Sequence, residues 1–110
     1  MTTTARVQAY LRAADLSRTR IISVAAELAM CESSLNRKLW AEGTRYRDLI
    51  DAERKRRAAA VVIANPRAAG WDIADACGYY STSHVYSSFR RWFGFGLREV
   101  RLGAVVGTVS

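Results

Sequence analysis

The stretch IADACGYYSTSHVYSSF, residues 73–89, decides the fold because an earlier stretch of the chain follows the same plan. Residues 24–39 read VAAELAMCESSLNRKL. Each stretch holds a short alanine-rich helical segment, a tight turn and a second helical segment with polar residues between apolar anchors. Leu35 and Leu39 align with Val85 and Phe89 at a period of 50 residues. Two such copies favour a tandem helix-turn-helix far more strongly than one copy would.

The rest of the chain also favours helices, and we expect an all-α fold of about seven helices. Residues 46–64 show helical spacing without Gly or Pro, and Asn65-Pro66 ends that segment. We therefore predict two helix-turn-helix subdomains joined by a long linker helix, together forming one DNA-binding domain. The expected segments are an N-terminal helix and loop at 1–20, the first helix-turn-helix at 21–45, the linker helix at 46–65, the second helix-turn-helix at 66–101 and an apolar tail at 102–110.

Length and composition exclude several classes of protein. The chain has 110 residues, of which 50% are hydrophobic and 25% charged, as in a globular domain. It shows neither a signal-peptide pattern nor an apolar run long enough to span a membrane. One His and two well-separated Cys leave a zinc site dependent on scattered carboxylates. No catalytic constellation or phosphate loop is readable, so we expect no enzyme, no metal and no cofactor.

The positive charge is mostly arginine. The chain carries 17 Lys+Arg against 10 Asp+Glu, and only Lys38 and Lys55 are lysines. Arginine suits phosphates and guanine edges, which favours nucleic acid as a partner. The largest surplus lies in residues 45–67, with Arg54-Lys55-Arg56-Arg57 at its centre. We interpret that run as a solvated face with one or two core-bridging arginines; Arg54 and Arg57 could equally join the two halves through Glu27 or Asp75.

Residues 24–101 resemble the DNA-binding domain of AraC/XylS-type transcription regulators. The most specific pieces are ACGYYSTSHVYSSFRRWFG at 76–94 and LNRKLWAEGT at 35–44. The chain departs from the family pattern at three places. Ala29 stands where the family has Gly, and an alanine there costs on the order of 1 kcal/mol if φ is positive. Cys31-Glu32 replace Ser-Pro, and residues 94–101 lack the family's Pro and Tyr.

The resemblance implies which residues contact DNA. On the first recognition helix, base reading falls to Ser33, Asn36 and Arg37, since Asn pairs with adenine and Arg with guanine. On the second, the candidates are the short polar residues Thr82, Ser83, His84 and Ser87. Phosphate contacts are expected from Lys38, Ser81, Arg90 and Arg91. We expect the first module to read sequence and the second mainly to position the protein.

Several of these residues have a simpler structural interpretation. His84 could serve only a helix N-terminus, and Lys38, Arg90 and Arg91 could be solvated surface. We expect Trp40, Tyr86, Trp92 and Phe93 in the core and Trp71 covering it. Cys77 is expected to be small, packed and inert. Cys31 lies near a helix N-terminus, which lowers a thiol pKa and leaves redox or methyl-acceptor sensing open.

These patterns predict a sequence-specific regulator that binds double-stranded DNA as a monomer, reads two adjacent major grooves and contacts RNA polymerase. The alternative is a protein-interaction adaptor that binds polymerase or another regulator and has little affinity for DNA. Its supporting feature is the uncharged, β-prone tail at 102–110. The cysteine usage indicates a cytoplasmic protein, associated with a bacterial or phage-type nucleoid.

Overall fold

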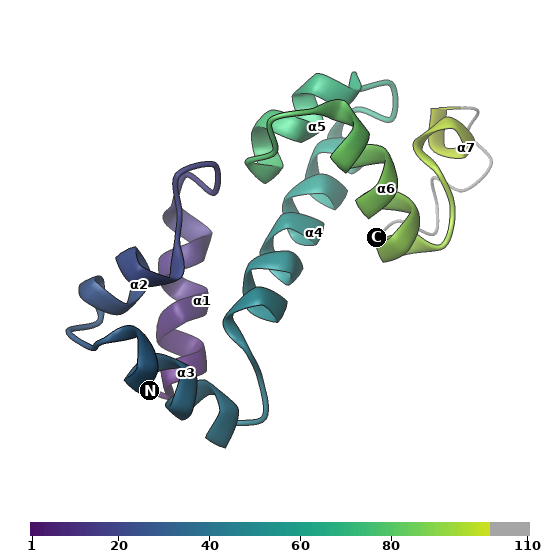
Figure 1. Cartoon of the computed structure of the whole chain (residues 1–110). Helices are drawn as coiled ribbons and strands as arrows, with labels where there is room; N and C mark the ends of the chain where they lie inside the picture. Colours follow the sequence, from purple (N-terminus) through teal and green to yellow (C-terminus); the bar gives the residue numbers. More distant parts are fainter. Residues whose placement is uncertain (102–110) are drawn as a thin grey trace. The chain divides into compact units, whose positions relative to one another are not determined.

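The computed structural model describes residues 1–101, which contain seven α-helices and no strand (Figure 1). The helices are α1 (Thr3–Ala13), α2 (Ile21–Glu27), α3 (Glu32–Ala41), α4 (Tyr46–Ala64), α5 (Gly70–Cys77), α6 (Thr82–Phe93) and α7 (Leu97–Arg101). The prediction of an all-α fold is confirmed. The apolar tail at 102–110 lies outside the described residues.

The chain forms two compact units, Met1–Glu53 and Arg54–Ser110, and the boundary between them falls inside α4. Asn65 and Pro66 follow α4 directly, as expected for a helix ended by proline. The division of the chain into the five segments expected from the sequence, with their boundaries, remains a prediction.

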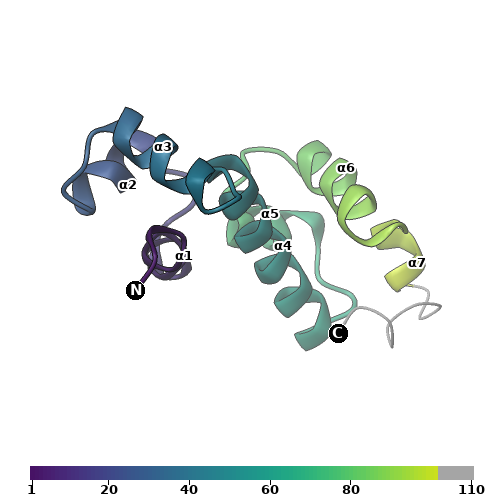
Figure 2. The ribbon, with the colours of Figure 1, turned by 90° about the horizontal axis from the view of Figure 1, so that it is seen from below.

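The first unit is built on an aliphatic core. Leu35 and Leu39 of α3 are fully buried, and Leu49 and Ile50 come from the beginning of α4. In this unit α2 and α3 lie side by side, and Figure 2 looks along the axis of α1. The remaining buried members are Val7, Leu11, Leu16, Val24, Ala25 and Leu28.

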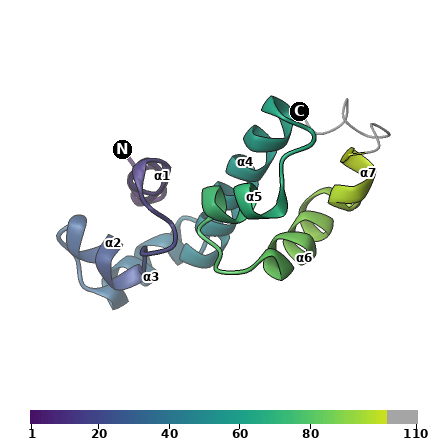
Figure 3. The same cartoon turned by 90° about the horizontal axis from the view of Figure 1, so that it is seen from above.

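The second unit repeats this arrangement with a more aromatic core. Val85 and Phe89 of α6 are fully buried, in the places that Leu35 and Leu39 take in the first unit. Ala58 and Val62, near the end of α4, pack with them, as do Ile73, Ala74, Cys77 and Leu97. Figure 3 shows α5 and α6 of this unit from above. The predicted period therefore places equivalent anchors in two separate cores.

The two turns between paired helices share one hydrogen-bonding pattern. Met30 N–H donates to the carbonyl of Ala25, and Tyr79 N–H donates to that of Ala74, each at 2.9 Å. The preceding residue is left-handed in both turns, with φ of 58° at Ala29 and 78° at Gly78. This is the Schellman closure of a helix C-terminus. Residue 29 therefore does have a positive φ, the condition under which an alanine in place of glycine is costly.

Three aromatic side chains expected in or over a core are exposed instead. Trp40 is 71% exposed, Trp71 59% and Tyr86 46%. Trp40 lies next to Leu39 in the sequence, but one residue on an α-helix turns the side chain by about 100°. It therefore shares the outward face of Asn36, one turn earlier. Trp92 and Phe93 do pack partly buried against the second core, as expected.

Candidate nucleic-acid interface

The first candidate surface is the outward side of α3. Its anchors Leu35 and Leu39 hold the inward side in the core, so the residues between them face solvent. Ser33, Asn36 and Arg37 are all exposed. Their positions, three and four residues apart, lie on one helix face. The structure therefore brings together the three base-reading candidates of this module.

The second candidate surface is the corresponding side of α6. Ser83, His84 and Ser87 are exposed, and Thr82 is half-buried at the first position of the helix. Ser81 occupies the N-cap position, but its side chain makes no capping hydrogen bond. A hydroxyl there can donate to an anionic oxygen beside the helix N-terminus. The side chains on this second face are thus polar and mostly short, and they include no Lys, Arg, Asp or Glu.

Tyr79 packs beneath this surface and contacts one of its residues, His84. Its ring stacks on Trp92 at 6.4 Å between centroids and meets His84 edge-on at 5.6 Å. Its hydroxyl lies 2.9 Å from that of Ser88, and the Arg54 guanidinium sits 4.9 Å from the ring centroid. His84 is therefore oriented by a ring contact.

The phosphate candidates have different surroundings. Lys38 is exposed in the last turn of α3. Arg90 pairs with Glu99 at 3.8 Å, and the pair is too exposed to hold the guanidinium strongly. The Arg91 guanidinium lies 5.7 Å from the Trp92 ring centroid.

Two arginines of α4 secure the end of α5. Arg54 Nε donates to the carbonyl of Cys77 at 3.1 Å, and Arg57 Nη1 donates to that of Ala76 at 3.3 Å. Carbonyls at a helix C-terminus are otherwise unpaired, so cations there stabilise the helix. Lys55 and Arg56 are exposed, which agrees with the expected mixture of bridging and solvated residues.

The two cysteines have opposite environments. Burial raises the pKa of Cys77 to about 11, and its thiol donates to the Arg54 carbonyl at 3.3 Å. Cys31 is exposed at the N-cap of α3, with its sulfur 3.3 Å from the Ser33 hydroxyl and 3.2 Å from that of Ser34. Hydrogen bonding with the hydroxyl of Ser33, and then with that of Ser34, lowers the pKa of Cys31 to about 6. Cys77 is a packing residue, and Cys31 is an accessible thiol with a pKa lowered towards neutrality.

Sequence reasoning missed the role of Glu42. Its carboxylate accepts hydrogen bonds from the N–H groups of Thr3 and Thr4, at 3.1 and 2.7 Å, and from the Thr4 hydroxyl. These bonds, with Thr4 contributing most, lower the pKa of Glu42. Glu42 follows α3 directly, so it ties the recognition helix to the beginning of α1. Nothing local in the sequence signals a contact across 38 residues.

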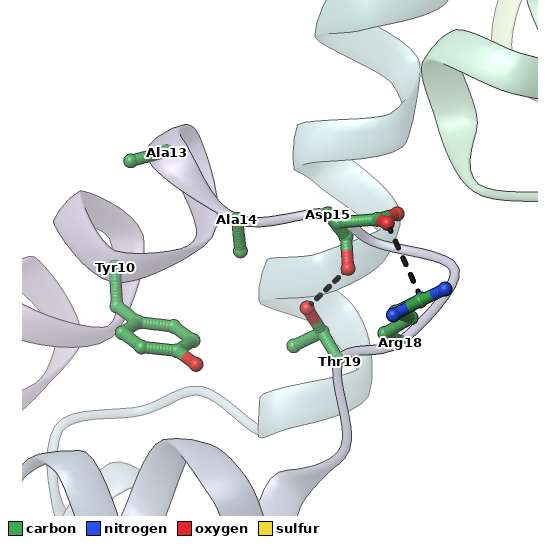
Figure 4. A pocket seen from close by; sticks show the side chains of 6 residues that line it. All are labelled: Tyr10, Ala13, Ala14, Asp15, Arg18 and Thr19. Carbon is green, nitrogen blue, oxygen red and sulfur yellow. Dashed lines mark hydrogen bonds and ion pairs between the residues drawn. The ribbon is translucent and has the colours of Figure 1, made fainter.

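A pocket of about 390 Å³ lies where α1 ends, lined by Tyr10, Ala13, Ala14, Asp15, Arg18 and Thr19 (Figure 4). Its charged groups, Asp15 and Arg18, pair with each other at 3.8 Å. Among the described residues, no three His, Cys, Asp or Glu form a group that could hold a metal ion. None of the helices described is long and apolar enough to cross a membrane.

Two helix-turn-helix units, each with a polar face on its second helix, are typical of nucleic-acid-binding folds. The chain is similar to known proteins of this class. The chain is 32% identical over 96 residues to the HTH-type transcriptional regulator VqsM of Pseudomonas aeruginosa. The matched region covers 87% of this chain and 29% of that protein. It is 41% identical over 86 residues to the HTH-type transcriptional regulator VirS of Mycobacterium tuberculosis, covering 77% and 25%. No family model matches the chain.

A solved structure extends the similarity to the fold. A DNA-binding transcriptional dual regulator from Escherichia coli K-12 matches with a TM-score of 0.85 and 26% identity, over 96% of this chain and 94% of that one. The resemblance to AraC/XylS-type regulators is thereby confirmed, and the chain is a homologue of HTH-type transcriptional regulators. It spans less than a third of the length of the curated relatives that it matches.

Proposed function

We propose that this chain is a sequence-specific, double-stranded DNA-binding transcription regulator in which α3 and α6 enter adjacent major grooves. The observation that carries the proposal is that both helices expose a polar face to solvent. In each, two fully buried anchors leave the polar side free, as a groove-reading helix requires. The relatives, which are transcription regulators, support the same reading. The role is one of binding, without catalysis.

The residue roles follow from the chemistry of each face. Asn36 and Arg37 can form bidentate pairs with adenine and guanine, each worth about 1–3 kcal/mol of discrimination. Thr82, Ser83, His84 and Ser87 have short side chains suited to water-mediated and phosphate contacts as well as base edges. Lys38, Ser81, Arg90 and Arg91 add phosphate contacts. The first unit thus reads sequence, and the second mainly fixes position.

The protein acts as a monomer on an asymmetric site, because one chain carries both reading helices. Contact with RNA polymerase would couple binding to transcription. The place of action is the cytoplasm, at a bacterial or phage-type nucleoid.

The test is selection of bound duplexes from a random-sequence pool, followed by gel shifts in increasing salt. A regulator with several phosphate contacts should enrich one sequence and lose affinity steeply as salt rises. Enrichment of no sequence, with little affinity at any salt, would favour the adaptor function instead.

Two substitutions test the division of roles between the units. Arg37→Ala should relax the preference for one base pair by about 1–3 kcal/mol, whereas Ser87→Ala should weaken binding to all duplexes similarly. Repeating the selection with each variant measures both effects. Equal losses of specificity would contradict the division.

A further inference from the structure

Trp40 extends the exposed face of α3 beyond the residues assigned to base reading. It follows Ser33 by seven positions, Asn36 by four and Arg37 by three, which places all four on one side of the helix. A tryptophan that is 71% exposed leaves a large apolar surface in water. The sequence pattern assigned this ring to the core, so its actual position requires another explanation.

The ring forms part of a groove. A hollow of about 380 Å³ is lined by Ile21, Asn36, Trp40, Arg45, Tyr46 and Arg47, all within the first unit. Its walls combine apolar surface with two guanidinium groups. Arg45 pairs with Asp48 at 3.4 Å in an exposed position, and Arg47 is exposed as well. Asn36 belongs both to this groove and to the reading face.

The chemistry of the groove selects its occupant. A deoxyribose–phosphate strand alternates an apolar sugar with an anion, which matches an indole ring beside arginines. Continuity through Asn36 means that a duplex read by α3 passes directly over the groove. An uncharged protein surface would offer no anion to Arg47.

We propose that this groove holds the sugar–phosphate strand next to the bases that α3 reads. The Trp40 ring packs against a deoxyribose, and Arg47 contacts an adjacent phosphate. Trp40 is then a positioning residue, which adds affinity for all sequences alike. The inference rests on the proposed DNA-binding function.

The experiment compares the full chain with Trp40→Ala, Trp40→Phe and Arg47→Ala. Each is titrated onto a duplex carrying the selected sequence and onto a shuffled duplex. Arg18→Ala is the matched control for charge, because its side chain is 87% exposed and lines a different pocket. Urea unfolding checks folding, which the loss of an exposed ring should leave nearly unchanged.

Trp40→Ala should bind both duplexes about tenfold more weakly, because the apolar contact between one face of the ring and the deoxyribose is lost. Trp40→Phe should retain most of the affinity but reduce the change in tryptophan fluorescence that DNA induces in the unmodified chain, because only Trp71 and Trp92 then remain to report it. Arg47→Ala should lower the slope of log affinity against log salt by about one, and Arg18→Ala should lower it less.

Three results would overturn the inference. If the unmodified chain binds DNA and Trp40→Ala binds equally well, the groove has another occupant, such as a protein. If Trp40→Ala weakens only the selected duplex, the ring contacts a base rather than the backbone. If the unmodified chain binds neither duplex, the proposed function fails, and this inference fails with it.

Discussion

Ala29 adopts a backbone conformation that L-amino acids avoid, with φ of 58°. The left-handed region costs a residue with a Cβ about 1–2 kcal/mol, and glycine escapes this cost but loses more entropy on folding. We expect Ala29→Gly to raise the free energy of unfolding by up to about 1 kcal/mol in urea denaturation. Ala26→Gly is the matched control, because it makes the same substitution inside α2. It should lower the free energy of unfolding by about 1 kcal/mol. Destabilisation by both would contradict the strain at Ala29.

Cys31 should react at a pH where an ordinary thiol is protonated. With a pKa of about 6, lowered by hydrogen bonds with Ser33 and Ser34, the thiol should be mostly ionised at pH 7. Its alkylation rate should rise with a midpoint near pH 6, while buried Cys77, with a pKa of about 11, stays unmodified in the folded chain. Mass spectrometry after iodoacetamide treatment measures both. Replacing Ser33 and Ser34 with Ala should move the midpoint upward, and an unmoved midpoint would remove the assigned cause.

At the scale of elements, Glu42 makes the attachment of α1 dependent on pH. Its pKa is lower in the folded chain than in the unfolded one, so the stabilisation is complete above the unfolded value. It is lost as the pH falls through the folded value. Urea midpoints of the unmodified chain and Glu42→Gln should therefore differ at neutral pH and converge in acid, well below 4.5. Thr4→Ala keeps both N–H donors and should show a smaller deficit; a gap that persists in acid would contradict the assignment.

The helices were predictable because their signals are local. Leu35, Leu39, Val85 and Phe89 follow helical spacing, and all four are fully buried. Trp40 was misplaced because its apolar character outweighed its position, although spacing from Asn36 already puts it on the outer face. The contact of Glu42 with α1 depends on how distant segments pack, and a single sequence carries no signal for that. The predicted base-reading residues are exposed, apart from half-buried Thr82 at the beginning of α6.

At the scale of the whole molecule, the continuous helix α4 serves both units. Leu49 and Ile50 belong to the first core, and Ala58 and Val62 belong to the second. Its 19 residues rise roughly 28 Å, comparable with the spacing of about 34 Å between major grooves on one side of B-DNA. The proposed two-groove binding by one chain should demand one particular spacing between the two contacted half-sites.

Inserting base pairs between the half-sites of the selected duplex tests that demand. About five added pairs rotate one half-site by half a turn to the opposite side of the duplex, so affinity should fall to that of one unit alone. The same insertion outside both half-sites should leave affinity unchanged. Gel shifts on the three duplexes provide the measurement. Equal binding to all three would contradict two-groove binding by one chain.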